Sequence, residues 1–381
     1  MNDLKIEIAK SRTWAEIDLN NLAENFKILR AKVNPAVKFL AVCKADAYGH
    51  GAVECAKKFE SLGADYLAVA SAVEGVQLRN NGIKIPVLCL SCPDPSLAEL
   101  LLENKITVSL GDFESGKKIS DLIKSKNSKL KIHVKIDTGM SRTGFYWPSD
   151  ENEKLKCANE IKNLCELPGF EAEGIFTHFA AADDDENFTA LQLEKFLDAK
   201  KILAGLGIKF KISHAAASSG LLNFPSSLLD MIRAGLALYG YADTEKGNEN
   251  SSLNLKPVMK VKSKIIAVRS MPAHSTISYG RTFELKRDSK IAVLPVGYAD
   301  GFNRLLSNNF SVKIHGSLCP ILGRICMDMC MADVTDLKDV RAGDIATILD
   351  GDLIPAAAKN SNTIIHEILC GVSSRVPRVF L

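Results

Sequence analysis

A single lysine stands where an apolar run of the sequence ends. Residues 39–43 have the composition of a buried parallel strand, and Lys44 follows them directly. Gly49 and Gly51 come next, before a helical pattern that begins at Ala52. A lysine between an apolar strand and a glycine-containing turn loses hydration, which disfavours its charged form and leaves an amine that can act as a nucleophile or base. Such lysines bind carbonyl cofactors covalently, whereas the alternative is an ordinary surface lysine.

A second cationic side chain lies in a tight loop. Gly139 and Gly144 bracket Arg142, directly after the apolar run 130–137. A guanidinium at this place is either a surface group paired with Asp137 or a fork for a carboxylate or phenolate oxygen.

Two further polar residues belong to other apolar runs. His178 ends the run 172–178, where a hydrogen-bonded core histidine and a functional residue are about equally good interpretations. Arg233 lies within a later run, and the bland alternative for it is a buried ion pair with Asp230.

Hydroxyl groups and backbone amides near the end of this region are suited to a phosphate. Ser218 and Ser219 follow one apolar run, and Gly235 and Leu236 lie at the end of the next. In barrels of parallel strands, the loops after the seventh and eighth strands form a recurrent phosphate site. Taken alone, the Ser-Ser-Gly sequence indicates only a turn.

The elements that must position these residues repeat as strand–helix units. Helical patterns at 72–80, 113–124 and 191–206 separate several of the apolar runs. The strand-like runs are residues 37–44, 66–71, 85–91, 106–110, 130–137, 172–178, 210–214 and 232–239. Their number and spacing predict a (β/α)8 TIM-type barrel, in which the carboxyl ends of the strands carry the chemistry.

The rest of the sequence differs in its periodicity. A polar segment at 243–252 is typical of a linker, and residues 258–268 then alternate at period two. Weaker alternation predicts further strands at 290–296, 310–314, 325–334 and 345–349, and only residues 353–361 near the end have helical spacing. We therefore expect an α/β protein with an N-terminal barrel (12–243) and a mostly-β C-terminal domain (253–381), which an N-terminal strand at 1–11 would join.

Composition limits the possible partners. The 381 residues are 46% hydrophobic and 24% charged with a net charge of +3, which does not indicate a nucleic-acid or membrane partner. The N-terminus lacks a signal-peptide core, so we expect a cytoplasmic protein. The 10 cysteines include the close pairs Cys89/Cys92 and Cys326/Cys330, for which packing is a better interpretation than a metal or redox role.

Residues 42–51, Val-Cys-Lys-Ala-Asp-Ala-Tyr-Gly-His-Gly, resemble the pyridoxal-phosphate (PLP) lysine motif of the alanine racemase family. Further segments of this family follow in order at 277–282, 295–301, 323–329 and 373–378, so that the resemblance extends from Trp14 to Arg378. It implies a PLP-dependent enzyme that interconverts L-alanine and D-alanine for peptidoglycan. It also implies a homodimer in which each active site is shared by two subunits.

The resemblance implies a role for particular residues. Racemisation needs a base on each face of the substrate Cα atom, and the family pattern assigns these roles to Lys44 and to Tyr279 of the other subunit. It assigns the substrate carboxylate to Arg142 and to the backbone amide of Met327. Lys135 matches a lysine that is often carbamylated in the family and would then pair with Arg142.

The same pattern implies a set of cofactor contacts. Arg233 would face the pyridine nitrogen and, because arginine keeps its proton, leave that nitrogen unprotonated. The remaining expected contacts are Lys44, Tyr48, His178, Ser218, Gly235, Leu236 and Ser374.

Two positions depart from the family pattern. Ala217 stands where asparagine is common, and Ser374 where tyrosine is common. A smaller residue at 374 predicts a roomier pocket that accepts serine beside alanine. Three alternatives to a racemase remain. The first is a PLP-dependent amino-acid decarboxylase, whose late cysteine motif we do not find. The others are a non-catalytic PLP carrier, which would consist of the barrel alone, and a racemase-like sensor domain.

Overall fold

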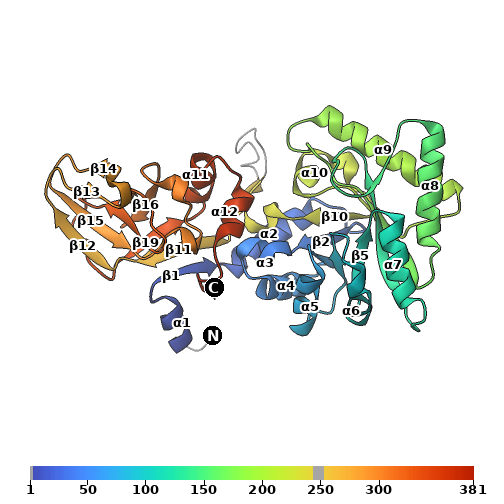
Figure 1. The fold of residues 1–381 in the computed structure, drawn as a ribbon, viewed down its shortest axis with the longest axis horizontal. Coiled ribbons are helices and arrows are strands. Elements are labelled where there is room, and N and C mark those ends of the chain that lie inside the picture. The colour runs from blue at the N-terminus through green and yellow to red at the C-terminus, as the bar shows by residue number, and fades with distance from the viewer. Residues whose placement is uncertain (1–2, 243–252) are drawn as a thin grey trace. The chain divides into compact units, whose positions relative to one another are not determined.

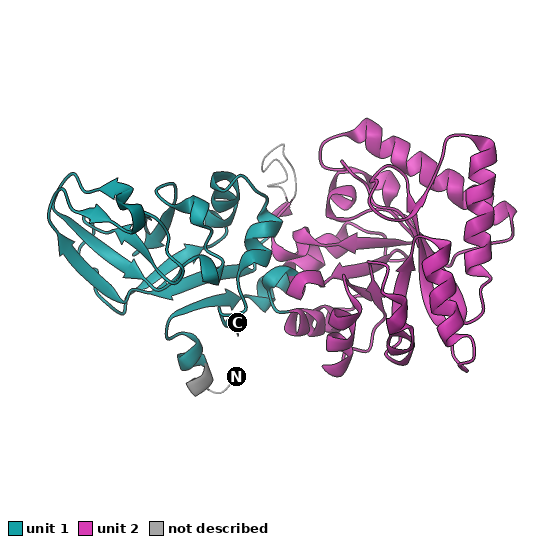
Figure 2. Cartoon of the chain, in the orientation of Figure 1, with its two compact units in different colours: residues 1–22, 48–51, 256–381 teal, residues 23–47, 52–255 magenta. Residues whose placement is uncertain are grey.

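The computed structural model of the chain describes residues 3–242 and 253–381, so the predicted linker at 243–252 lies outside the described residues. Its contacts divide the chain into two compact units (Figure 2). The barrel unit contains Ala23–Ala47 and Ala52–Leu255, and the C-terminal unit contains Met1–Leu22, Tyr48–Gly51 and Lys256–Leu381. These units differ from the predicted ranges 12–243 and 253–381 in placing residues 1–22 and 48–51 with the C-terminal sheet.

Eight parallel strands form the barrel unit (Figure 1). Their order is β10-β2-β3-β4-β5-β6-β8-β9, and the short β7 (Phe145–Tyr146) pairs with β6. The eight strands are β2 (Lys38–Val42), β3 (Tyr66–Val69), β4 (Val87–Cys89), β5 (Ile106–Leu110), β6 (Leu130–Asp137), β8 (Phe170–Phe176), β9 (Ile212–His214) and β10 (Met231–Ala234). Between β9 and β10 the ring is nearly closed by backbone bonds from Asp230 to Ser213 and from Arg233 to Ala216, both 3.0 Å long. The predicted (β/α)8 barrel is confirmed.

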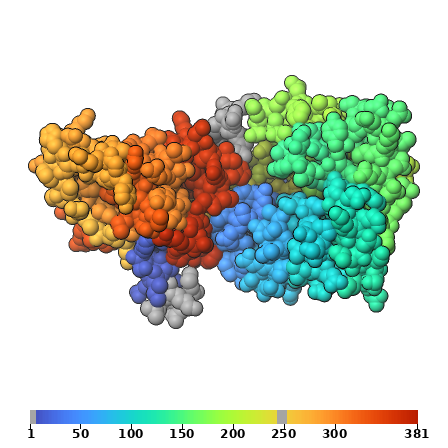
Figure 3. Space-filling model, in the orientation of Figure 1, coloured from blue at the N-terminus to red at the C-terminus, as the bar shows by residue number. Residues whose placement is uncertain are grey.

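Helices lie around the strands of this unit (Figure 1), and Figure 3 shows one face of its surface, coloured from blue to yellow-green. The helices are α2 (Leu19–Ala31), α4 (Ala52–Ser61), α5 (Ala72–Asn80), α6 (Ala98–Glu103), α7 (Phe113–Ile123), α8 (Glu151–Cys165), α9 (Glu186–Gly205) and α10 (Ser218–Asn223), with the 3-10 helices η1 (Pro95–Leu97), η2 (Pro225–Ser227) and η3 (Leu236–Tyr239). Side-chain caps define where several of them begin. Asp112, Asp150 and Asp185 each accept a backbone N–H of the first turn, and Ser71 with Glu74 forms a capping box on α5.

The C-terminal unit is mostly β. Its largest sheet has the order β17-β16-β19-β11-β1-β20, beside a sheet of β12-β15-β18 and the pair β13-β14. The strands are β1 (Thr13–Ile17), β11 (Met259–Lys264), β12 (Ala267–Met271), β13 (Thr276–Ile277), β14 (Phe283–Glu284), β15 (Ser289–Leu294), β16 (Ser311–Ile314), β17 (Ser317–Pro320), β18 (Cys330–Asp333), β19 (Ile345–Leu349) and β20 (Arg378–Phe380). The helices are α1 (Asp3–Ala9), α11 (Leu353–Asn360) and α12 (Ile365–Gly371), with the 3-10 helices η5 (Tyr279–Arg281), η6 (Tyr298–Asp300) and η7 (Arg304–Leu306). A mostly-β second domain is therefore confirmed.

Four local predictions are wrong. The N-terminal strand at 1–11 is not formed, because Asp3–Ala9 is helical and the strand that joins this sheet is β1. β10 ends at Ala234, since Gly235 leaves the extended conformation and η3 follows. The predicted strand 325–334 shortens to β18, because the Cys326 amide bonds back to Met329 (2.9 Å). The helix α12 was not predicted, since its seven residues are too few for a clear period.

In the two described ranges, no helix combines the length and the apolar character needed to cross a bilayer.

Candidate active site

Lys44 lies at the carboxyl end of β2. The Val42 carbonyl oxygen accepts a hydrogen bond from the Tyr239 hydroxyl (2.8 Å), and the Cys43 amide donates to the Ala68 carbonyl (2.7 Å). Both bonds fix the backbone immediately before Lys44, which is half-buried. The lysine therefore has a well-defined origin at the end of a buried strand, as the sequence predicts.

The segment after Lys44 has an unusual backbone. Residues 45–48 all have φ of 53° to 54°, so α3 (Lys44–Gly49) is a left-handed turn. Each L-residue in this conformation costs about 1–2 kcal/mol. Specific bonds hold it: the Ala45 amide donates to Glu74, and Asp46 accepts from the Ala52 amide, both at 2.7 Å. The sequence predicted a turn here but not its hand.

The end of this turn belongs to the C-terminal unit. Gly49 and Gly51 have positive φ, and a Cβ atom on Gly49 would lie 2.3 Å from the Leu369 carbonyl oxygen. Arg378 donates from Nε to the Gly49 carbonyl (3.0 Å). Tyr48, an expected cofactor contact, is buried with its ring centroid 5.6 Å from that of His366. Close packing thus explains both glycines and fixes the position of Tyr48.

Basic side chains gather at the carboxyl ends of the barrel strands. Burial, followed by the charges of Arg142, Arg233 and Lys44, lowers the pKa of Lys135 to about 8, and only Asp137 opposes this effect. Lys135 is buried and donates to Thr143 Oγ1 (2.6 Å). Four cationic groups are therefore close enough to repel one another, which is the electrostatic setting of an anion-binding site.

Asp137 does not pair with Arg142. Its Oδ1 atom accepts hydrogen bonds from the backbone amides of Gly139 (2.9 Å) and Ser141 (3.1 Å), so it organises the loop rather than neutralising the arginine. Within the described residues, Arg142 makes no ion pair, and its side chain is exposed. The surface-pair interpretation of Arg142 thus loses its proposed partner.

Arg233 is the most strongly constrained member of the group. It donates to His214 Nδ1 (2.8 Å), to His178 Nδ1 (3.2 Å) and to the carbonyl oxygens of Thr177 (2.9 Å) and Ala215 (2.8 Å). Burial lowers the pKa of Arg233 to about 9, so the side chain still carries its proton at neutral pH. Its orientation is therefore set by four acceptors.

Both histidines beside Arg233 are neutral. Burial and then the charge of Arg233 lower the pKa of His178 to about 3, and the same two causes lower that of His214 well below its usual value. The alternative interpretation of Arg233, a buried ion pair with Asp230, does not hold, since Asp230 accepts from the amide (2.8 Å) and hydroxyl of Ser213. Sequence reasoning missed His214, although its place at the end of β9 was the available signal.

The expected phosphate residues also meet. Ser218 is buried, and its hydroxyl oxygen accepts from the amides of Gly235 (2.9 Å) and Ala237 (3.4 Å). Leu236 begins η3 directly after Gly235. The start of α10 and the end of β10 are thus tied together by one serine, next to Ala217, where the family pattern has asparagine.

This set of groups fits PLP. The cofactor is a phosphorylated pyridine with anionic oxygens, and it would meet four basic side chains, one of which starts at a strand end. Arg233 offers a fixed, protonated donor to a ring nitrogen, and Ser218 with its neighbouring amides is suited to phosphate. In the described part of the chain, no three His, Cys, Asp or Glu residues are grouped for a metal ion, and all ten cysteines are free thiols.

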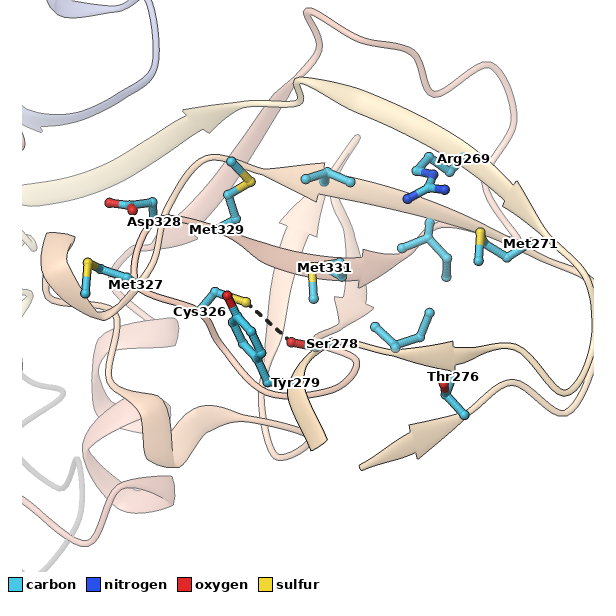
Figure 4. Close-up of a pocket in the computed structure, with 13 residues that line it drawn as sticks. Arg269, Met271, Thr276, Ser278, Tyr279, Cys326, Met327, Asp328, Met329 and Met331 are labelled. Atoms are coloured by element: carbon cyan, nitrogen blue, oxygen red, sulfur yellow. Dashed lines mark hydrogen bonds between the residues drawn. The ribbon is translucent and has the colours of Figure 1, made fainter. Parts of the chain in front are cut away.

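Two other expected site residues share a groove in the C-terminal unit (Figure 4). Tyr279 is 71% exposed and Met327 is 53% exposed. They line a space of about 530 Å³ together with mostly apolar side chains, among them Met271, Met329 and Met331. The groove therefore offers one phenol on an otherwise largely apolar surface.

A strained turn presents Tyr279. Ser278 and Gly280 on either side of it have φ of 64° and 69°, and the Ser278 hydroxyl donates to the Arg324 carbonyl (2.5 Å). A Cβ atom at Gly280 would lie 2.9 Å from Arg324. Ser374, the last expected contact, is an exposed residue of the same unit.

Both halves of the chain match family models. Residues 17–243 match the alanine racemase N-terminal domain and residues 258–380 the alanine racemase C-terminal domain. The chain is 42% identical to alanine racemase 2 of Caldanaerobacter subterraneus subsp. tengcongensis, over 97% of this chain and 95% of that protein.

Solved structures give the same result. The alanine racemase of Clostridium difficile 630 superimposes with a TM-score of 0.93 at 38% identity, covering 97% of this chain and 96% of that one. The alanine racemase of Bartonella henselae with covalently bound pyridoxal phosphate has a TM-score of 0.85 at 28% identity, covering 97% of this chain and all of that one (100%).

Proposed function

The chain belongs to the alanine racemase family and is an enzyme of that family, and from this premise we propose that it interconverts L-alanine and D-alanine with PLP by a two-base reaction. The observation that carries the proposal is the group of four basic side chains at the barrel mouth, which includes Lys44 and a fully oriented Arg233. The match to the C-terminal family model argues against a PLP carrier made of the barrel alone.

PLP, when bound, supplies the electron sink for the negative charge left on Cα after its proton leaves. Lys44 Nζ holds the cofactor and moves the Cα proton on one face. Tyr279 Oη moves the proton on the opposite face, and we assign to it the proton of L-alanine. Arg142 and the Met327 amide bind the substrate carboxylate; in the described residues that amide has no other acceptor.

Arg233 controls how strongly the ring withdraws electrons. A guanidinium that already donates from both terminal nitrogens has little freedom to turn, and it keeps its own proton. Arg233 held in this way would donate a hydrogen bond to the ring nitrogen of bound PLP without giving up its proton, which would leave that nitrogen unprotonated and the ring a weaker electron sink. That setting favours prompt return of the proton over transamination.

Each active site is proposed to need two copies of the chain. Tyr279 is exposed beside Met327 on a groove lined by methionines, a surface that is typical of one buried in an assembly. We propose a two-fold homodimer in which this surface supplies Tyr279 to the partner's barrel. The product D-alanine would serve peptidoglycan synthesis.

The small side chain at position 374 supports a broader substrate range. Serine is alanine with one added hydroxyl, and a pocket that lacks the bulk of tyrosine would admit it. We propose turnover of L-serine beside L-alanine. We also propose a carbamate on Lys135, which would turn one of the four basic groups into an anion and leave Lys44, Arg142 and Arg233 as the cations of the site. The anion would lie beside Arg142, where the described residues provide only Asp137, which is already bonded to the backbone.

The test combines a spectrum with peptide mapping. Purified enzyme loaded with PLP should absorb at roughly 420 nm, lose that band with borohydride, and yield one modified peptide that contains Lys44. The same preparation should convert L-alanine to D-alanine until the two are equal. Modification at another lysine, or carbon dioxide release instead of D-alanine, would contradict the proposal.

A further inference from the structure

A row of four polar residues is buried inside the barrel unit. Arg233 donates to His214 Nδ1 (2.8 Å), His214 Nε2 lies 2.8 Å from His133 Nδ1, and His133 Nε2 lies 3.4 Å from Glu173 Oε2. We call these four residues the buried polar row. All four are almost fully excluded from solvent, and they come from strands β6, β8, β9 and β10. Arg233 and His214 belong to the site described above, whereas His133 and Glu173 extend the row away from it.

The two ends of the buried polar row fix the direction of every hydrogen bond in it. A guanidinium can only donate, an ionised carboxylate can only accept, and a neutral imidazole donates from one nitrogen and accepts at the other. His214 must accept at Nδ1 from Arg233 and donate from Nε2. His133 must then accept at Nδ1 and donate from Nε2 to Glu173. Both histidines are therefore restricted to the Nε2–H tautomer.

Both ends have the required charge state. Burial alone would raise the pKa of Glu173, but hydrogen bonds from His133, Lys131 and Tyr66 outweigh it and lower the pKa to about 2. The Lys131 ammonium lies 2.5 Å and the Tyr66 hydroxyl 2.8 Å from the carboxylate. Glu173 is thus ionised, and both of its oxygens accept hydrogen bonds.

The packing around the row leaves little room for another arrangement. A Cβ atom at residue 174 would lie 2.6 Å from the His133 ring, so Gly174 is needed to seat that ring. The Phe176 ring is stacked on His214 at 4.8 Å with an interplanar angle of 1°, and the Arg233 guanidinium lies 5.5 Å from the same ring. Ring planes and bond directions are therefore set together.

We infer that Glu173, acting through His133 and His214, is a positioning residue that holds Arg233 in the orientation in which it meets the cofactor ring. This inference rests on the proposed function, because it assigns the held guanidinium to PLP. If the Glu173 carboxylate is replaced by a group that can also donate, His133 Nε2 no longer has to carry the proton. His133 can then carry its proton on Nδ1, where it would face the Nε2–H of His214. His214 would have to move its proton to Nδ1 to avoid this clash, and Nδ1 could then no longer accept from Arg233.

The first arm of the test needs no cofactor. Nitrogen-15 NMR of histidine-labelled apoprotein should show His214 and His133 as Nε2–H tautomers. In Glu173→Gln, the His133 signal should change its tautomer or become a mixture. Tyr66→Phe is the matched control, because it removes one bond to Glu173 but keeps the carboxylate, and it should leave both tautomers unchanged.

The second arm measures the affinity of the apoprotein for PLP. Titration of apoprotein with PLP should give a dissociation constant roughly tenfold higher for Glu173→Gln than for Tyr66→Phe. Should Glu173→Gln fail to fold, a pair at position 133 decides the same question. His133→Gln can still accept from His214 and donate to Glu173, so it should bind PLP like the wild type, whereas His133→Leu should bind roughly tenfold more weakly.

The outcomes separate the inference from the function it rests on. Wild-type tautomers with wild-type PLP affinity in folded Glu173→Gln, or wild-type PLP affinity in folded His133→Leu, would overturn the inference, because the row would then be packing alone. A wild-type protein that neither binds PLP nor racemises alanine would overturn the proposed function, while the NMR arm would still decide whether Glu173 sets the two tautomers.

Discussion

The two units prepare their expected site residues in opposite ways. In the barrel unit, Lys135 and Arg233 are buried, and each has specific partners at 2.6–3.2 Å. In the C-terminal unit, Tyr279 and Met327 are 71% and 53% exposed on a groove of methionines. One set of groups is positioned within a single chain, and the other is presented on a surface.

This difference indicates how the catalytic groups of each unit are positioned. Buried cations that repel one another require fixed acceptors and a bound anion, so the barrel mouth is organised around its ligand. An exposed phenol gains a low-dielectric surrounding only when another surface covers it. We therefore expect changes in the barrel to affect the cofactor, and changes at Tyr279 to affect proton transfer alone.

The first prediction concerns Lys44 in the barrel unit and has the largest expected effect. Lys44→Ala should remove covalent PLP attachment and reduce racemisation by roughly a thousandfold or more, because both the anchor and one base are lost. Absorbance of the purified variant and a coupled D-alanine assay measure the two effects. If the variant kept the absorbance band of attached PLP, another lysine would have to be the anchor.

The second prediction concerns Tyr279, the exposed residue of the C-terminal unit. Tyr279→Ala should retain PLP, while net racemisation falls by roughly 10²–10⁴-fold in both directions, since the equilibrium constant is fixed. In heavy water, D-alanine should still exchange its Cα proton through Lys44, whereas L-alanine should not. Tyr279→Phe is the matched control for lost volume. Equal exchange of both enantiomers, or loss of PLP, would count against Tyr279 as a base.

The third prediction concerns acid and the buried histidines of the barrel. Their folded-state pKa values are lowered, to about 3 for His178 and below the usual value for His133 and His214. The unfolded chain therefore binds more protons below pH 6.5, so stability is present above that pH and is lost as the pH falls toward the folded values. The free energy of unfolding should drop by up to about 4 kcal/mol between pH 7.5 and pH 5.5.

Urea unfolding at the two pH values measures this loss. The variant His133→Gln should show a smaller loss, because one of the three histidines is gone. A stability that does not change between these pH values would mean that the histidines are protonated in the folded protein.

The smallest expected effect lies at position 374 of the C-terminal unit. Ser374→Tyr should lower kcat/KM for L-serine by roughly tenfold and change that for L-alanine much less, since the added ring narrows the pocket only for the larger side chain. Steady-state kinetics on both amino acids measure it. Poor serine turnover already in the wild type, no better than in Ser374→Tyr, would remove the argument for a roomier pocket.

Sequence alone predicts much of the barrel for a simple reason. The strands at 66–69 and 87–89 are continuous apolar runs, and the helix at 72–80 has a capping serine, so local pattern and tertiary role agree. The segment 325–334 alternates only weakly, and a backbone hydrogen bond from Cys326 to Met329 forms a loop in place of the first part of the predicted strand.

Other features could not be predicted because no local preference encodes them. Alanine and tyrosine do not favour positive φ, so the left-handed turn at residues 45–48 depends on contacts with Glu74 and Asp46. His133 and Glu173 lie in separate strands and meet only when the barrel forms. A charged residue inside an apolar strand was the one available signal, since it implies a buried partner.

Mixing two inactive variants tests most directly whether Lys44 and Tyr279 of different copies form one active site. Co-expression of Lys44→Ala with Tyr279→Ala chains should restore about a quarter of wild-type racemase activity, because half of the dimers are mixed and each mixed dimer regains one complete site. The separately expressed variants serve as controls. If the mixture stays as inactive as they are, although mixed dimers are isolated, the two residues act within a single chain and the account of a shared site is contradicted.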